Sequence, residues 1–177
     1  IPAPAWELFR IRPANFPTSR LAALTHLLRH YHQEGMAAGI LNLVREAPVP
    51  QGYGGLRKGL VVASAGYWLN HYDFGAATQV RLPTLLGDDR ADEINMNVIL
   101  PFAFALNNEL AEKAVALYRS YPRVAENSTE KQMKQQLGLS NKAVNSAQKQ
   151  QGLLQIYHTL CSHGKCGECP LAGQNPK

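Results

Sequence analysis

The sequence predicts an all-α protein, a single irregular helical domain of about seven helices. Apolar side chains recur at helical spacing in several segments, and no stretch shows the sustained alternation of apolar and polar residues that is typical of a strand. The 177 residues suit one domain with a continuous core. A hydrophobic fraction of 45% excludes a disordered chain, and no apolar run approaches the roughly 18–20 residues of a membrane span.

The first half of the chain begins with a lead-in over residues 1–18, which four prolines make irregular. A helix is expected from Thr18 or Ser19, residue types that cap helix N-termini, up to Gly35. Its apolar stripe is expected to contain Leu21, Leu24, Leu28 and Tyr31. Two further helices, separated by a loop rich in proline and glycine, are expected over about 36–46 and 57–72.

The second half of the chain predicts a central helix over about 89–107, for which Asp88 and Asp89 supply capping and negative charge. From residue 94 this segment is apolar nearly all round, which is typical of a buried helix, and Pro101 predicts a kink or break inside it. The remaining helices are expected over about 109–121, 129–137 and 141–160. The helical body therefore covers residues 19–160.

All three cysteines lie at the C-terminus, and a Cys-rich tail over residues 161–177 follows the helical body. Their spacing is Cys161-x4-Cys166-x2-Cys169. The two thiols of the CxxC pair can reach one metal ion from a single turn. One histidine would complete a closed tetrahedral zinc site, with His158 as the preferred fourth ligand and His163 as the second choice. The tail is therefore expected to form a short metal knuckle with a structural role.

Three alternatives to zinc stay open at this point. An iron–sulfur cluster normally uses four cysteines, so a fourth ligand would come from an upstream part of the protein. A CxxC pair can also be redox-active, although the βαβ context of a thioredoxin-like site is missing here. The simplest alternative is that the three thiols are free, or incidentally oxidised, near the C-terminus.

A basic segment beside the cysteines suggests a nucleic-acid contact. Residues 128–177 contain six Lys and two Glu, so they hold +4 of the formal net charge of +5, which favours a polyanion. Residues 129–150 can be aligned with a helix-turn-helix that has Gly138 in its turn. The candidate contacts to DNA or RNA are Lys134, Asn141, Lys142, Asn145 and Lys149. The alternative is that these side chains form the solvated face of two ordinary amphipathic helices.

No catalytic residue is assigned, because the sequence contains no P-loop, GxSxG or GxGxxG motif. Asp89 and Glu93 could share a helix face as a metal-binding pair, but helix capping with a surface network centred on Arg90 is favoured. The chain starts without an initiator Met and without a signal peptide, so we expect a fragment of a longer cytoplasmic protein.

Arg12, Asn15 and Arg20 surround a proline-rich turn before the first expected helix. Two interpretations are open for this group. The side chains could hold an anion or a carboxylate, or they could fix the lead-in against the end of the helix, which is the interpretation that we favour.

Several short motifs occur together along the chain. They are RPANFP at 12–17 followed by Arg20 and Leu21, LGDDRADEI at 86–94, NVILPF at 97–102, and QGL at 151–153 before the C-x4-C-x2-C-Pro end. In this combination they resemble the C-terminal part of a bacterial family of unknown function, domain of unknown function 2851. The resemblance implies a longer protein whose upstream region is strand-rich and faintly like restriction-endonuclease-type nucleases.

The expected function is that of a non-catalytic helical C-terminal module with a structural zinc-binding cysteine cluster and an accessory role in nucleic-acid binding. The resemblance implies an alternative, a part of a metal-dependent nuclease-like enzyme whose active site lies upstream. In that case the tail cysteines and an upstream ligand would hold a metal cluster that staples the two parts. In both cases the expected partner is the upstream region of the same protein.

Overall fold

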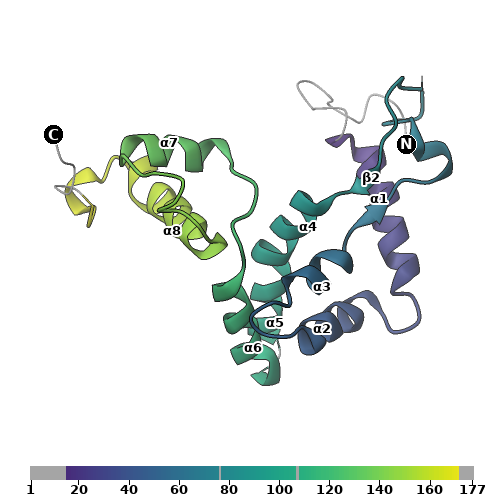
Figure 1. Cartoon of the computed structure of the whole chain (residues 1–177), viewed down its shortest axis with the longest axis horizontal. Coiled ribbons are helices and arrows are strands. Elements are labelled where there is room, and N and C mark those ends of the chain that lie inside the picture. Colours follow the sequence, from purple (N-terminus) through teal and green to yellow (C-terminus); the bar gives the residue numbers. More distant parts are fainter. Residues whose placement is uncertain (1–14, 76, 107, 172–177) are drawn as a thin grey trace.

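The computed structural model describes residues 15–75, 77–106 and 108–171, and this part of the chain is mostly helical, as the sequence predicts. The α-helices are α1 (Pro17–His30), α2 (Met36–Glu46), α3 (Tyr53–Lys58), α4 (Asp88–Ile94), α5 (Leu100–Leu106), α6 (Asn108–Ser120), α7 (Ser128–Gln136) and α8 (Ala147–Thr159). Two short strands, β1 (Val62–Ala63) and β2 (Thr84–Leu86), pair antiparallel. Figure 1 shows α1–α6 as one body, with α7 and α8 to one side of it.

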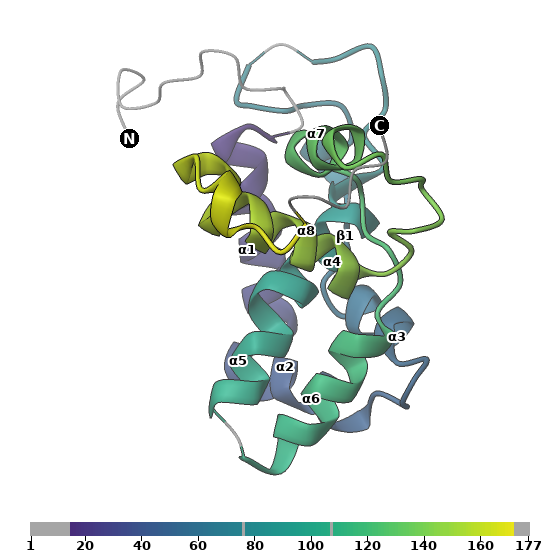
Figure 2. The ribbon, with the colours of Figure 1, turned by 90° about the vertical axis from the view of Figure 1, so that its left-hand side faces the viewer.

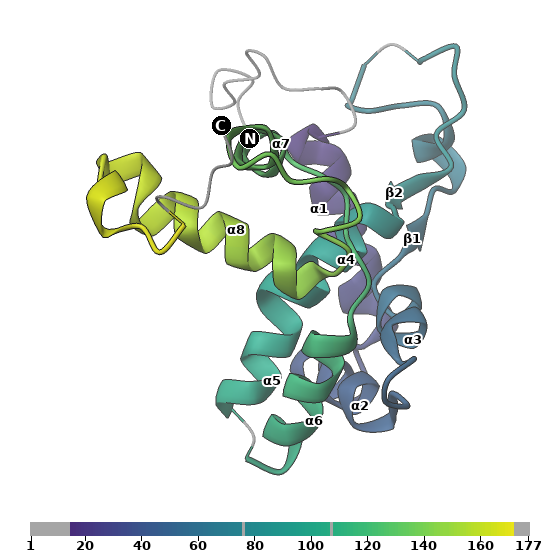
Figure 3. The same cartoon turned by 60° about the vertical axis from the view of Figure 1, so that its left-hand side comes forward.

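The larger apolar core lies where α1, α2 and α3 meet a rod that contains α4, the π-helical turn Asn95–Ile99 and α5 (Figure 3). We call residues 88–106 the α4–α5 rod. Val44, Leu56, Met96 and Leu117 are almost completely buried in this core. α6 runs antiparallel along α5 and closes the core on the other side (Figure 2).

The buried face of α1 differs from the stripe of leucines that the sequence predicts. Ser19, Ala23, Leu27 and Tyr31, spaced four residues apart, face the core. Leu21, Leu24 and Leu28 are instead 48%, 42% and 50% exposed. This face of α1 packs against β2, and the short side chains of Ser19 and Ala23 are part of it.

The α4–α5 rod is also not buried all round, which corrects the expectation of a central buried helix. Met96, Ile99, Leu100 and Ala103 face the core, whereas Val98, Phe102, Phe104 and Leu106 are exposed. The π turn lies directly before Pro101, where the Leu100 N–H donates to the Asn95 carbonyl. The expected irregularity therefore takes the form of a π turn. No helix within the described ranges is long and apolar enough to cross a membrane.

The helix expected over about 57–72 is wrong, because α3 ends at Lys58. Gly59 follows, packed against Leu43, and Val62 then pairs with Leu86 in the small sheet. This pairing joins segments that are far apart in the sequence, so helical spacing within the segment could not reveal it. The sheet is a small departure from the expected all-α class.

A second and smaller apolar core holds α7 against α8. Met133, Val144 and Leu153 are its buried members. The second helix of this pair begins at Ala147 and not at residue 141, because Ser146 caps it with a side-chain oxygen that accepts from the Lys149 N–H. The α7–α8 pair therefore has its own core, joined to the larger body through α6 and the segment that follows it.

Candidate functional site

The three cysteines lie on a compact reversal of the chain directly after α8, which we call the cysteine turn (residues 160–169). It consists of two consecutive 3-10 turns, Cys161–His163 and Cys166–Glu168, joined through Gly164 at φ +66°. This positive φ favours glycine. The Lys165 N–H donates to the Leu160 carbonyl at 3.0 Å, and the Cys169 N–H donates to the Cys166 carbonyl at 3.2 Å. Backbone hydrogen bonds thus close the chain around the positions that carry the thiols.

All three cysteines are free thiols. Cys166 is exposed, Cys169 is half-buried, and Cys161 packs against the small core of the α7–α8 pair. The His158 side chain is exposed, and its ring meets the Tyr157 ring edge-on at 5.4 Å between centroids. In the part of the chain that the structure describes, no three or more His, Cys, Asp or Glu side chains are grouped to hold a metal ion. The expected ligands therefore share one short segment without being assembled around one point.

The chemistry of these donors fits zinc or an iron–sulfur cluster. Three thiolates and one imidazole nitrogen are a standard ligand set for a closed zinc site. A cluster would need a fourth ligand in addition to these thiols. The described turn supplies the backbone reversal that carries these side chains.

The helix-turn-helix expected over 129–150 does not form. That motif joins its two helices by a turn of about 3–4 residues, whereas residues 137–146 separate α7 from α8. Asn141, Lys142 and Asn145 lie in this connection, and only Lys149 lies on the second helix, in its first turn. The four side chains are exposed, so they are still accessible to a polyanion, although not from a recognition helix.

Lys134 lies in a buried polar cluster. Its side chain is 8% exposed; the ammonium contacts a Glu126 carboxylate oxygen and donates to Asn141 Oδ1 at 2.6 Å. The Glu130 carboxylate, 3.9 Å from Lys134 Nζ, accepts from Gln150 Nε2 at 2.6 Å and lies 3.1 Å from Arg123 Nη2. These contacts fix α7 to α8 and to the segment before α7, and they leave Lys134 little access to a phosphate group.

A second buried polar cluster connects α3, the α4–α5 rod and the end of α6. Arg57 donates to both oxygens of Asp92, from Nε at 2.8 Å and from Nη2 at 2.7 Å. The Tyr121 hydroxyl donates to Asp92 Oδ1 at 2.7 Å, and Asn95 Nδ2 donates to that hydroxyl at 3.2 Å. Sequence reasoning missed this cluster. The only local signal was an acidic residue on the inner face of a helix next to apolar positions.

The surface arrangement that the sequence favours for the remaining acidic residues is present only in part, because the N-cap of this helix is Gly87 and no side chain caps it. Arg90 Nη1 lies 2.5 Å from Glu93 Oε2, and Asp88 and Asp89 lie in the first turn of α4. Negative charge at this end complements the helix dipole. In the described chain, Asp89 and Glu93 belong to no group of three or more His, Cys, Asp or Glu side chains that could hold a metal ion.

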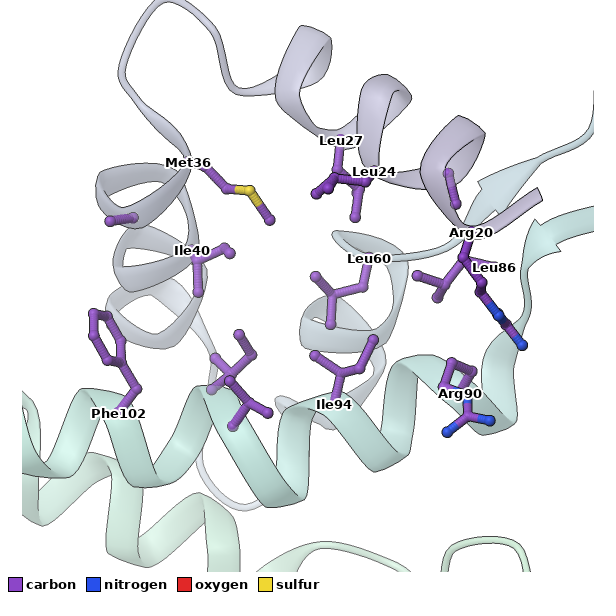
Figure 4. Close-up of a pocket in the computed structure, with 14 residues that line it drawn as sticks. Arg20, Leu24, Leu27, Met36, Ile40, Leu60, Leu86, Arg90, Ile94 and Phe102 are labelled. Atoms are coloured by element: carbon purple, nitrogen blue, oxygen red, sulfur yellow. The ribbon is translucent and has the colours of Figure 1, made fainter. Parts of the chain in front are cut away.

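A cavity of about 740 Å³ lies between α1, α2 and the α4–α5 rod. All but two of the residues that line it are apolar, and the two exceptions are Arg20 and Arg90. Figure 4 shows these arginines together at one end, with Met36 and Phe102 at the other. Arg20 Nη2 also bonds to Asn15 Oδ1, which supports the expectation that this pair fixes the helix start, while Arg12 lies outside the described residues. The cavity could not be found from the sequence, because its walls come from four separate segments.

Comparison with known proteins identifies one family. A family model described as "Protein of unknown function (DUF2851)" matches residues 1–129. No curated protein and no solved structure matches the chain. The matched residues include the cavity and the Asp92 cluster, whereas the cysteine turn lies beyond them.

Proposed function

We propose that this chain, which belongs to the DUF2851 family of proteins of unknown function, is a non-catalytic helical module with a structural metal site in its C-terminal cysteine turn. One observation carries the proposal. Three free thiols lie on a single chain reversal that backbone hydrogen bonds close and a glycine with positive φ permits. The ion would cross-link the turn at the point where the chain leaves α8.

A structural ion is useful here because the core beneath it is small. Three buried apolar side chains, Met133, Val144 and Leu153, form the centre of the α7–α8 core, and Cys161 packs against it. Cores of this size give little stability alone. Binding of a metal ion to the folded state would increase the free energy of unfolding. The proposed ligands are Cys161, Cys166, Cys169 and His158, with His163 as the alternative fourth ligand.

Metal analysis of the protein, purified without chelator and without oxygen, tests this proposal. We expect one zinc ion per chain and, after exchange with Co²⁺, the absorbance of tetrahedral cobalt thiolate. Cys166→Ser and Cys169→Ser should lose the ion, whereas Ser162→Ala, which changes a neighbouring side chain that is no ligand, should keep it. His158→Ala and His163→Ala identify the fourth ligand. A brown protein that contains iron would show that the site holds an iron–sulfur cluster and not zinc. A metal-free protein would refute the proposal.

An accessory nucleic-acid contact is the second candidate, and the exposed cations beside α8 favour it. Lys142 and Lys149 are exposed next to Asn141 and Asn145, and Lys149 Nζ donates to Asn145 Oδ1 at 3.0 Å, which holds the cation near the amide. Such side chains contact phosphates and bases in many complexes. This candidate no longer includes Lys134, which the buried cluster occupies.

Fluorescence anisotropy with labelled duplex DNA and single-stranded RNA at several salt concentrations tests the second candidate. Loss of Lys142 and Lys149 together should make the negative slope of log K against log salt shallower by about 2 for duplex DNA, because each phosphate contact contributes about −0.9 to it. Lys131→Ala removes an exposed lysine of α7 and serves as the matched control. An equal change in slope per lysine removed in both proteins would mean that only overall charge matters.

The enzymatic alternative, part of a metal-dependent nuclease, stays a prediction. Its active site is expected upstream, and in the described residues no three or more His, Cys, Asp or Glu side chains are grouped to hold a metal ion. Incubation of the full-length protein with Mg²⁺ and labelled DNA separates the two classes: cleavage supports the enzyme, and binding without cleavage supports the accessory module.

A further inference from the structure

The cavity between α1, α2 and the α4–α5 rod has a strongly uneven distribution of charge. Its side walls consist of aliphatic side chains, a methionine and a phenylalanine, and its charged side chains, Arg20 and Arg90, lie at one end (Figure 4). The apolar space extends from these arginines to Met36 and Phe102. The shape is that of a slot with one cationic end.

The cationic end has more positive than negative charge within the described part of the chain. Arg90 is paired with Glu93 at 2.5 Å. Arg20 donates to two neutral acceptors, the Leu85 carbonyl at 3.5 Å and Asn15 Oδ1. Burial and the neighbouring Arg90 charge lower the pKa of Arg20, while Glu93 acts in the opposite direction. Two guanidinium groups thus share one carboxylate, and an anion at this end would relieve their repulsion.

The apolar part of the slot is open to water along one side. Leu24, Val98 and Phe102 line the cavity and are nevertheless 42%, 54% and 38% exposed. Exposed apolar side chains that border one concave surface are typical of a ligand-binding groove. The volume of about 740 Å³ lies within the range of about 300–1,000 Å³ that is common for small-molecule sites.

We propose that this cavity binds an anionic amphiphile, an unbranched hydrocarbon chain that ends in a carboxylate or a phosphate. The head group contacts Arg20 and Arg90, and the chain lies along the apolar walls towards Met36 and Phe102. Charge complementarity at one end of the cavity selects for the anionic head group. Apolar contact along the rest selects for the hydrocarbon chain. The site is separate from the cysteine turn and does not depend on the metal proposal.

Isothermal titration calorimetry of the full chain with dodecanoate, below its critical micelle concentration, tests the proposal. Dodecanol has the same chain without the charge and should bind at least about tenfold more weakly, since it lacks charge-assisted hydrogen bonds. Hexanoate keeps the charge and should also bind more weakly, because each buried methylene contributes to affinity. Dodecyl phosphate in place of dodecanoate shows which head group is preferred. Equal affinity for dodecanoate and dodecanol would overturn the proposal. Failure of both dodecanoate and dodecyl phosphate to bind would overturn it as well.

Variants of the lining residues provide the second half of the test. The double variant Arg20→Gln with Arg90→Gln should weaken dodecanoate binding at least about tenfold. Ala37→Phe places a ring on the α2 wall and should reduce binding of dodecanoate and dodecanol alike. Arg29→Gln removes an exposed arginine of α1 that does not line the cavity, and it should bind as the parent protein does. If the double variant behaves like Arg29→Gln, the arginines do not hold the head group. Circular dichroism melts confirm that each variant is folded.

Discussion

Asp92 is a buried charged residue whose two partners, Arg57 and Tyr121, come from distant parts of the chain. Its side chain is 7% exposed, and it accepts two hydrogen bonds from Arg57 and one from Tyr121. A bidentate arginine and a phenol satisfy most of the hydrogen-bonding capacity of a carboxylate. This saturation makes Asp92 a structural residue, although it lies in a sequence segment rich in acidic residues.

Asp92→Asn tests the importance of this carboxylate. The amide would leave Arg57, whose side chain is 30% exposed, without its closest counter-charge, and would turn an NH₂ group towards one of the two donors. We expect a loss of about 2–4 kcal/mol in the free energy of unfolding, measured by urea denaturation. Asp89→Asn changes an exposed carboxylate of the same helix and should have an effect of less than about 1 kcal/mol.

Tyr121 makes the stability of the folded protein depend on pH in the alkaline range. Burial, followed by its hydrogen bond to Asp92, raises the pKa of Tyr121 above its usual value. The folded protein therefore keeps the phenol proton after the unfolded chain loses it near pH 10. This contribution to stability is complete below about pH 10 and is lost as the pH rises above it.

Tyr121→Phe should lower the free energy of unfolding by about 1–2 kcal/mol at neutral pH, because the hydrogen bond to Asp92 is removed. The variant should also lose less stability than the parent protein between about pH 9 and pH 11. Some loss of stability with rising pH should remain in the variant, since burial also raises the pKa values of Tyr31 and Tyr118. Urea midpoints measured across this pH interval test the prediction, and parallel curves for the two proteins would contradict it.

At the scale of the elements, α2 packs tightly behind the end of α1 because Gly39 has no side chain. A Cβ at Gly39 would collide with the Tyr31 ring and would lie 2.8 Å from Glu34 Oε1. Tyr31 is buried and donates its hydroxyl to the Gly59 carbonyl at 2.8 Å, so the ring has little freedom to move. The close contact therefore requires glycine for steric reasons.

Gly39→Ala should lower the free energy of unfolding by about 1–3 kcal/mol, the usual effect of overpacking a core. Gly54→Ala in α3 is the matched control, because a Cβ there would meet no other atom within 4 Å. That control should be neutral or should stabilise the protein by up to about 1 kcal/mol, since alanine favours a helix over glycine. Thermal melts compare the two variants, and equal melting temperatures would contradict the steric explanation.

At the scale of the whole molecule, the described chain has two apolar cores, and a polar cluster lies beside the smaller one. The smaller core between α7 and α8 depends on the cluster of Lys134, Glu126 and Glu130 beside it. The hydrogen bond from Lys134 is the main reason why the pKa of Glu126 is lowered. A carboxyl group with a lowered pKa stabilises the folded state at neutral pH, and this contribution is lost as the pH falls through about 4.5 and below.

The α7–α8 pair should therefore loosen in acid before the larger body does. Amide hydrogen exchange at about pH 3.5, corrected for the intrinsic rate, should show loss of protection in α7 and α8 while α2 and α6 stay protected. Glu126→Gln should show reduced protection of α7 already at neutral pH and a smaller further loss in acid. Uniform loss of protection across both cores would mean that the molecule unfolds as one unit.

Much of the secondary structure could be predicted from the sequence, because its signals are local. α2 and α6 follow the spacing of apolar residues, and Pro101 marked the irregular part of the rod. The helix expected over 57–72 is wrong because Val62 pairs with a strand more than 20 residues away in sequence. The start of α8 was placed too early, at about residue 141, because the expected helix-turn-helix has a short turn. The helix begins after Ser146, whose side chain caps it.

The candidate sites also differ in whether the sequence alone could predict them. The sequence by itself determined the helical class and the close spacing of Cys161, Cys166 and Cys169, since backbone propensity and nearby positions are properties of a short segment. Only the tertiary structure decided which face of α1 is buried, that Lys134 belongs to an ion-pair cluster, and that Arg20 and Arg90 meet at one end of a cavity. Burial and electrostatic environment depend on side chains that folding brings together from distant positions, and no short stretch of sequence contains that information.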